Sequence, residues 1–259
     1  MNVGSLFAGI GGLDLAVGGT PEWFCEADQH CRAVLERHWP GVPILPDVRD
    51  LDGGTPRVDV LCGGYPCQPF SVAGRRRGED DDRHLWPEFA RLIRLLRPRV
   101  VVAENVAGHL RLGFDAVLSD LARVGMHVRW GVVRASDAGA PHRRARLFFV
   151  AADADRDGLQ VVWRQQPVER DPDGRGREDV AWGAYEPAIR RWERSLRRPA
   201  PRPTDDRGRL MPEFVEWMMG LPAGWTAGPA RTHRLRMLGN AVVPQQAALA
   251  LRLLTGEAA

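Results

Sequence analysis

The first 152 residues alternate short apolar runs with segments of helical periodicity, and this alternation limits the possible folds more than any other feature of the chain. Runs rich in apolar and β-branched residues predict strands at 2–8, 22–27, 58–64, 99–106 and 144–152. Helical spacing predicts helices at 11–18, at 85–97 and at 115–125, and one more that follows the second strand and ends at Arg37. Strands that alternate with helices are typical of a parallel α/β sheet with helices on both faces.

This pattern stops at about residue 153. The next stretch, to residue 208, is rich in Arg, Asp, Gly and Pro, and only 186–198 favours a helix. Regular structure then returns, with helices predicted at 212–220 and 243–256. The chain is therefore expected to divide into a core at 1–152, a short irregular insert at 153–208, and a C-terminal part at 209–259 that completes the core.

Composition excludes several classes of protein. The 259 residues carry a formal net charge of +3, and the 36 Lys and Arg positions are all Arg. No apolar run reaches the roughly 20 residues that a membrane span needs, and the N-terminus lacks the basic segment of a secretory signal. We therefore expect a cytoplasmic protein with no membrane partner. The four cysteines, Cys25, Cys31, Cys62 and Cys67, form no zinc-spaced cluster, so no metal site is expected.

Asparagine is rare in this chain. It occurs only at Asn2, Asn105 and Asn240. A GC-rich genome explains both the absence of Lys and the scarcity of Asn. In such a background, the two internal asparagines are expected to do something that a substitute could not.

A glycine-rich turn, FAGIGG, follows the first predicted strand and opens a helix. Backbone N–H groups at such a turn suit a nucleotide-like or carboxylate group. The dinucleotide fingerprint G-x-G-x-x-G fits Gly9 and Gly11, but Asp14 stands at its third glycine, which disfavours a nicotinamide-dependent oxidoreductase. Glu26, at the end of the second strand, could accept hydrogen bonds from a ribose diol. Taken alone, the turn fits either a cofactor site or a merely tight turn.

A rigid thiol is predicted at the same edge of the sheet. Cys67 lies beyond the third predicted strand between Pro66 and Pro69, which fix the backbone on both sides of it. Glu104 and Asn105 end the neighbouring strand, and a desolvated carboxyl there could stay protonated and donate to a ring nitrogen. Arg144 and Arg146, two residues apart at the start of a further strand, are expected on one face. Together these residues indicate an active site.

The chain resembles the DNA cytosine-5 methyltransferases. FAGIGG resembles the first cofactor motif of that family, GGYPCQPFS its catalytic loop, ENV its glutamate motif, HRRAR its Q-x-R-x-R and RLRMLGNAVVPQQ its closing motif. The resemblance covers about 1–152 and 209–259. It implies a Rossmann-like fold of S-adenosylmethionine-dependent methyltransferases, with a small irregular target-recognition insert in residues 153–208.

The resemblance implies a covalent mechanism on a flipped cytosine. Cys67 would attack C6 as a thiolate, and Glu104 would bond to N3 and the exocyclic amine. C5 would then take the methyl group of S-adenosylmethionine before the thiol leaves. Arg146 would hold the cytosine O2 or orient the site, with Arg144 in support, and Asn105 would brace the loop around Cys67.

The remaining roles that the resemblance implies concern the cofactor and DNA. The cofactor positions would be Phe7, Ala8, Gly9, Gly11, Gly12, Glu26, Asp47, Val48, Pro66, Leu85, Asn240 and Ala241. The DNA contacts would be Gln68, Ser71, Arg75, Arg76 and Arg77, in a mobile loop whose arginines bind phosphates. The expected partners are double-stranded DNA and, in a restriction–modification role, a cognate endonuclease; the alternative is an orphan phage-type role. The expected state is a monomer.

Two departures from the family pattern matter. His142 stands where the family usually has Gln, which leaves the role of that position open. The insert at 153–208 is short and carries no recognisable DNA-binding module, which suggests a short target or relaxed specificity. A tRNA cytosine-5 methyltransferase and a catalytically silent DNA-binding protein remain as alternative functions. The second would be favoured by loss of Cys67 or Glu104, and both are present.

Overall fold

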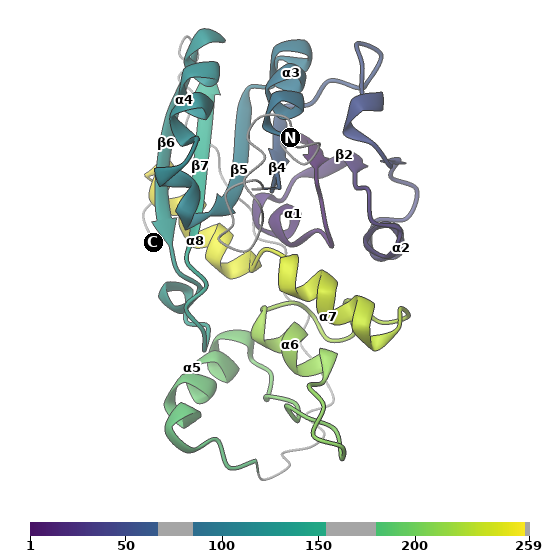
Figure 1. The fold of residues 1–259 in the computed structure, drawn as a ribbon, viewed down its shortest axis with the longest axis vertical. Helices are drawn as coiled ribbons and strands as arrows, with labels where there is room; N and C mark the ends of the chain where they lie inside the picture. The colour runs from purple at the N-terminus through teal and green to yellow at the C-terminus, as the bar shows by residue number, and fades with distance from the viewer. Residues whose placement is uncertain (67–84, 154–179, 257–259) are drawn as a thin grey trace.

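A computed structural model describes residues 1–66, 85–153 and 180–256 of the chain (Figure 1). A seven-stranded sheet forms its centre, with strand order β3-β2-β1-β4-β5-β7-β6. The strands are β1 Asn2–Leu6, β2 Thr20–Cys25, β3 Ile44–Leu45, β4 Val60–Gly63, β5 Val100–Val106, β6 Met126–Val133 and β7 Arg146–Asp153. Within the described part of the chain, no helix is long and apolar enough to cross a membrane.

Eight helices are recorded in these described ranges. They are α1 Gly12–Val17, α2 Gln29–His38, α3 Trp86–Leu96, α4 Phe114–Arg123, α5 Glu186–Leu196, α6 Pro212–Met218, α7 Arg231–Asn240 and α8 Pro244–Thr255. Short 3-10 turns are η1 Val48–Asp50, η3 Ala107–Arg111, η4 Ala135–Ala138 and η5 Gly183–Tyr185. The predicted alternation of strands and helices in the first half of the chain is confirmed, as are the predicted helices at α5, α6 and α8.

The sheet is mostly, but not wholly, parallel. Strands β1 to β5 pair in parallel, whereas β7 runs antiparallel to both β5 and β6. The connection from β6 to β7, residues 134–145, contains the short turn η4 and no α-helix, which suits an antiparallel pair rather than the helical crossover typical of a parallel one. The predicted mostly parallel sheet is therefore confirmed, and its antiparallel part lies at this edge.

Strand β6 was not predicted from the sequence. Its outer positions include Arg129 and the half-exposed Trp130, and Gly131 interrupts its alternation. An edge strand buries fewer side chains than a central one, so its apolar pattern is weaker.

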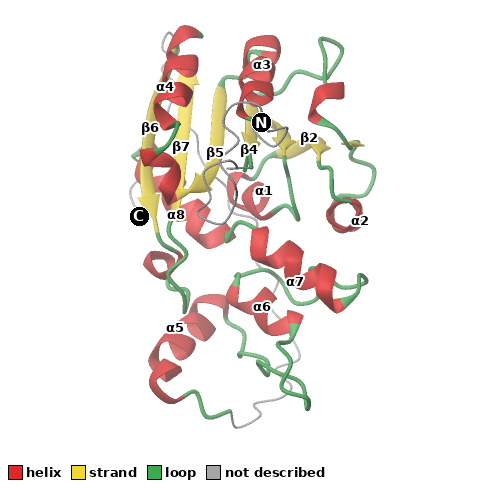
Figure 2. Ribbon diagram, viewed as in Figure 1, coloured by secondary structure: helices red, strands yellow, loops and turns green. Residues whose placement is uncertain are grey.

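Helices cover both faces of the sheet (Figure 2). One face packs against α3 and α4, and its core contains Leu61, Phe89 and Val101. The other face packs against α1 and α8, and its core contains Val102 and Leu251. Val101 and Val102 enter opposite cores because successive side chains of a strand point to opposite faces.

A third core lies between the glycine-rich turn and the C-terminal helices. It joins Ile10 and Val34 from the first half of the chain to Trp192, Trp217 and Leu238 from α5, α6 and α7. Helix α7 was not predicted, because only Met237 and Leu238 are its buried positions and they give no helical apolar period.

Candidate active site

The predicted carboxyl, Glu104, lies on β5, next to the strand that precedes the predicted thiol in the sequence. β4 and β5 pair in parallel with Gly63 opposite Ala103, so the chain that leaves β4 passes beside Glu104. A Cβ added to Gly64 would lie 3.3 Å from Glu104 Oε2, which leaves little space there for a side chain. Cys67 follows Gly64 by three residues. The predicted residues Cys67, Gln68, Ser71, Arg75, Arg76 and Arg77 lie outside the described residues.

Glu104 forms an ion pair with Arg146. Glu104 Oε1 accepts from Arg146 Nε at 2.9 Å, and the two side chains are only 13% and 20% exposed. Burial raises the pKa of the Glu104 carboxyl above its ordinary value, although the nearby charges of Arg146 and Arg144 oppose that shift. A carboxyl whose pKa is raised by burial and lowered by nearby arginines can accept a hydrogen bond as a carboxylate or donate one as an acid.

Arg144 has a different setting from the one predicted. It precedes β7 rather than lying in it, and its φ is 33°, so it does not share a strand face with Arg146. Its Nη2 donates to the carbonyls of Gly239 at 3.0 Å and Ala241 at 2.6 Å. Burial lowers the pKa of this guanidinium to about 10, which still leaves it charged at neutral pH. Arg144 thus ties the arginine motif to the closing motif.

Asn105 is hydrogen-bonded to the described chain just before Cys67. Its Nδ2 donates to the carbonyl of Tyr65 at 3.1 Å, and the side chain is buried. Tyr65 lies two residues before Cys67. The backbone N–H of Val106 donates to Asn105 Oδ1 at 2.8 Å, so both ends of the amide are used. An Asp could not make both contacts when ionised, because it has no donor.

The glycine-rich turn has one open position. Gly9 has a φ of 56°, and a Cβ added there would meet nothing within 4 Å. Its N–H donates to Glu26 Oε2 at 2.7 Å, while Glu26 Oε1 accepts from the N–H of Asp28 at 2.8 Å. Burial raises the pKa of Glu26 above its ordinary value. Phe7 also has a positive φ, of 52°, at the start of this turn.

Gly11 and Gly12 are explained by packing. A Cβ on Gly11 would lie 2.4 Å from the ring of Trp39, and one on Gly12 would lie 2.3 Å from the carbonyl oxygen of Val242. Both positions therefore need glycine whether or not they contact a ligand. Ala8, just beyond β1, donates its N–H to the carbonyl of Cys25 at 3.2 Å.

The other predicted cofactor positions lie in varied settings. Asp47 immediately precedes η1 and caps it, and hydrogen bonds from Arg49 lower the pKa of its carboxyl to about 2. Val48 is buried in the core, whereas Pro66 is exposed. Leu85 precedes α3 and packs against the core, Asn240 is exposed at the end of α7, and Ala241 is buried.

Gln246 is a connecting residue that was not predicted from the sequence. Its Nε2 donates to the carbonyls of Val133 and Arg144, each at 2.8 Å, so it joins the ends of β6 and of the arginine motif to α8. The side chain is fully buried among apolar positions of that helix. An amide at the apolar face of a predicted helix is the signal that could have found it, because a buried amide needs partners.

His142 has a partner that explains its position. Its Nε2 lies 3.0 Å from the carbonyl oxygen of Met218, at the end of α6. A carbonyl only accepts, so this nitrogen carries the hydrogen. Burial lowers the pKa of the ring, which favours the neutral form. A Gln amide could donate the same bond, so the histidine departs from the family pattern without losing this contact.

The comparisons with known proteins agree with one another. The model of the family described as C-5 cytosine-specific DNA methylase matches residues 1–176. The Type II methyltransferase M.HgiBI of Herpetosiphon aurantiacus is 35% identical over 162 residues, which are 59% of this chain and 37% of that protein. The Type II methyltransferase M2.BsuMI of Bacillus subtilis strain 168 is 35% identical over 187 residues, which are 68% of this chain and 48% of that protein. The matched regions thus span less than half the length of these relatives.

A solved structure supports the fold. A mutant of Spodoptera frugiperda DNMT2 superposes with a TM-score of 0.70 at 16% identity, over 98% of this chain and 99% of that one. At that identity the likeness concerns the fold alone, and it extends over the C-terminal helices as well as the sheet.

Proposed function

Because the chain belongs to the C-5 cytosine-specific DNA methylase family, we propose that it transfers a methyl group from S-adenosylmethionine to C5 of cytosine in double-stranded DNA. One observation carries this proposal most directly. The buried carboxyl of Glu104, paired with Arg146, lies beside Gly64, on the stretch of chain that leads to Cys67. An acid and a nucleophile next to each other are what attack on a pyrimidine ring requires.

Each side chain would have one task in the reaction. The Cys67 thiolate adds to C6 of a cytosine that has been flipped out of the duplex. Glu104 donates to N3 and so stabilises the negative charge that this addition places on the ring; its raised pKa favours the protonated form needed for that bond. Arg146 holds the Glu104 carboxyl in place. Once C5 carries the methyl group that S-adenosylmethionine would supply, a base would remove the C5 proton and Cys67 would leave as the thiolate.

The residues around Gly9 fit S-adenosylmethionine, which when bound supplies an electrophilic methyl group. The open side of Gly9 gives space for a ligand next to the backbone. Glu26 accepts one backbone hydrogen bond at each carboxyl oxygen, and its remaining lone pairs can accept from a ribose diol. Phe7, Asp47, Leu85 and the other predicted cofactor positions would complete the site.

The proposal extends to partners. Arg75, Arg76 and Arg77 would contact DNA phosphates, and Gln68 and Ser71 the flipped nucleotide. Residues 153–208 would recognise the target. The protein would act in the bacterial cytoplasm as a monomer, either alone or with a cognate restriction endonuclease.

Methylation sequencing of plasmid DNA from cells that express the protein tests this function, with Cys67→Ala as the comparison. We expect 5-methylcytosine in a fixed short context, and at least about a thousandfold less in the variant because the nucleophile is gone. Equal methylation by Cys67→Ala would contradict the mechanism. Methylcytosine in RNA but not in DNA would instead support the tRNA alternative.

A further inference from the structure

One segment of the C-terminal half reaches the glycine-rich turn. After α6, the chain crosses to the N-terminal half at residues 221–227, and the indole Nε1 of Trp225 donates to the carbonyl of Ile10 at 2.8 Å. Ile10 lies between Gly9 and Gly11 in the turn, and the Trp225 side chain is buried. The bond therefore connects residues that are 215 positions apart in the chain.

Aromatic contacts add to this connection. The Trp225 ring stacks on His38, with centroids 3.6 Å apart and an interplanar angle of 5°. It meets Trp39 edge-on at 5.7 Å. Trp39 in turn occupies the space where a Cβ of Gly11 would stand. Trp225 and Trp39 thus hold two consecutive residues of the turn, Ile10 and Gly11.

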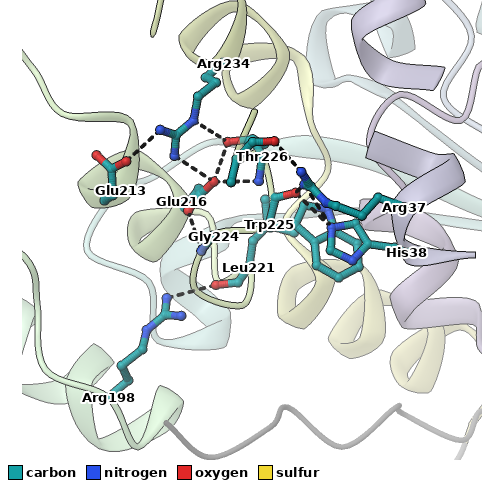
Figure 3. A network of polar contacts seen from close by, with 11 residues as sticks. Arg37, His38, Arg198, Glu213, Glu216, Leu221, Gly224, Trp225, Thr226 and Arg234 are labelled. Atoms are coloured by element: carbon teal, nitrogen blue, oxygen red, sulfur yellow. Dashed lines mark hydrogen bonds and ion pairs between the residues drawn. The ribbon is translucent and has the colours of Figure 1, made fainter. Parts of the chain in front are cut away.

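The segment that carries Trp225 is itself fixed on two sides, as Figure 3 shows. On the first side, Glu216 accepts from the N–H groups of Thr226 at 2.7 Å and Gly224 at 3.1 Å, and it pairs with Arg234 at 3.2 Å. On the second side, Arg37 donates to the carbonyls of Trp225 and Ala227.

His38 completes the second side. Its Nε2 lies 2.8 Å from the Trp225 carbonyl oxygen and donates to it, because a carbonyl only accepts. Burial lowers the pKa of the His38 ring, so its neutral form is favoured. The indole is therefore presented to Ile10 in one orientation.

We propose that Trp225 is a positioning residue for the cofactor site, and that it holds the glycine-rich turn in the conformation that accepts S-adenosylmethionine. The proposal rests on the proposed function. Gly9 and Gly11 have positive φ values, and glycine has more conformations to lose than other residues. A turn of this kind needs an outside contact to keep it in one of them, and Trp225 both donates a hydrogen bond to Ile10 and packs against Trp39, which lies against Gly11.

Trp225→Phe tests this proposal, because it keeps an aromatic ring and removes the donor to Ile10. Trp192→Phe is the matched control: the Trp192 indole is also buried and also donates at 2.8 Å to a backbone carbonyl, that of Trp217, away from the turn. Binding of S-adenosylhomocysteine, without DNA, is measured by calorimetry, and melting is followed by circular dichroism.

We expect both variants to lose similar thermal stability, and only Trp225→Phe to bind S-adenosylhomocysteine about tenfold more weakly, the effect of about one lost buried hydrogen bond. Its KM for S-adenosylmethionine should rise by a similar factor, while kcat at saturating cofactor and KM for DNA stay within about twofold. Equal affinity in Trp225→Phe and Trp192→Phe would overturn the proposal. A wild-type protein that binds no S-adenosylhomocysteine would instead overturn the proposed function.

A second variant covers the case in which Trp225→Phe does not fold. His38→Leu removes the stacked ring and one donor to the Trp225 carbonyl, but leaves the indole in place. We expect S-adenosylhomocysteine to bind about threefold more weakly to it. Unchanged affinity in a folded His38→Leu protein would contradict the role of this contact.

Discussion

Two buried glutamates, one at the sheet edge and one among the C-terminal helices, are both paired with arginine but are satisfied differently. Glu216, with a side chain 1% exposed, uses both oxygens: Gly224 donates to one, while Thr226 and Arg234 contact the other. Glu104 is 13% exposed, and among the residues that the structure describes, its ion pair with Arg146 engages only Oε1. Burial raises the pKa of Glu104.

The difference shows how a buried carboxyl can be assigned a role. A carboxylate whose lone pairs are already occupied by backbone and guanidinium donors has nothing left for a substrate, and it stabilises the fold. One that is buried with an oxygen left over can take a proton or a new partner. By this criterion Glu216 organises the segment at 221–227, whereas Glu104 is available for chemistry.

Among these substitutions, Glu104→Gln should cause the largest loss of activity. We expect methyl transfer to fall by a factor of about 10³, because the amide has no acidic proton to donate to N3. Stability should be unchanged or slightly higher: burial raises the pKa of Glu104, so its ionisation costs stability as the pH rises, and Gln avoids that cost.

Radiolabelled methyl transfer and urea unfolding measure both effects. Glu88→Gln is the control, since Glu88 pairs with Arg91 at 2.7 Å in a half-buried setting and is not itself a predicted site residue. A Glu104→Gln enzyme with more than a tenth of the wild-type activity would contradict the proposed role of Glu104 in the reaction.

Glu216→Gln should show the opposite pattern. Loss of its charge leaves Thr226, Gly224 and Arg234 imperfectly paired, and we expect the free energy of unfolding to drop by about 3 kcal/mol. Activity at saturating cofactor, well below the melting temperature, should stay within about threefold.

Urea unfolding at neutral pH tests that expectation. Glu186→Gln serves as the control, because its pair with Arg190 is about 40% exposed on both sides and should matter by less than about 1 kcal/mol. Equal losses in the two variants would show that Glu216 is not the organising contact.

The N-terminal and C-terminal parts of the chain also meet at Gly12, where a smaller effect on stability is expected. A Cβ there would come within 2.3 Å of the Val242 carbonyl oxygen, so Gly12→Ala should destabilise the fold by about 2 kcal/mol as backbone atoms move apart. Gly53→Ala is the control, since a Cβ at Gly53 meets nothing within 4 Å. Thermal melting of both variants measures the difference in stability. A Gly12→Ala protein as stable as Gly53→Ala would contradict the close contact between Gly12 and Val242.

Asp14 sharpens the comparison with a third buried carboxyl. Its Oδ1 accepts from Cys62 Sγ at 3.6 Å, and burial raises the pKa of the carboxyl to about 6. Because this folded-state pKa lies above the ordinary 3.8, the ionised form costs stability progressively from about pH 4 to pH 6, and the full cost persists at higher pH.

Asp14→Asn removes that cost. We expect the stability of this variant relative to the wild type to rise by about 1 kcal/mol from pH 5 to pH 7.5. Urea unfolding of both proteins at the two pH values measures this change. A difference between the two proteins that does not change with pH would show that Asp14 does not titrate in this range.

Local sequence patterns predicted much of this molecule. Apolar runs and helical spacing located β1, β4, β5 and the helices α3 and α8, because those elements bury a face and their periodicity follows. The ends of β4 and β5 placed Glu104 and Asn105 near the strand that leads to Cys67, because parallel strands end at one edge of a sheet.

Other features depend on elements that are distant in the sequence. The antiparallel pairing of β7, the turn of Arg144 away from its strand and the packing need for Gly12 all follow from how neighbouring elements meet. The bond from Trp225 to Ile10 spans 215 positions and has no local signature. The sequence by itself indicated most of the elements and the residue types of the proposed site, because periodicity and residue type act locally. Only the tertiary structure decided which buried groups find partners, because that depends on where separate elements come together.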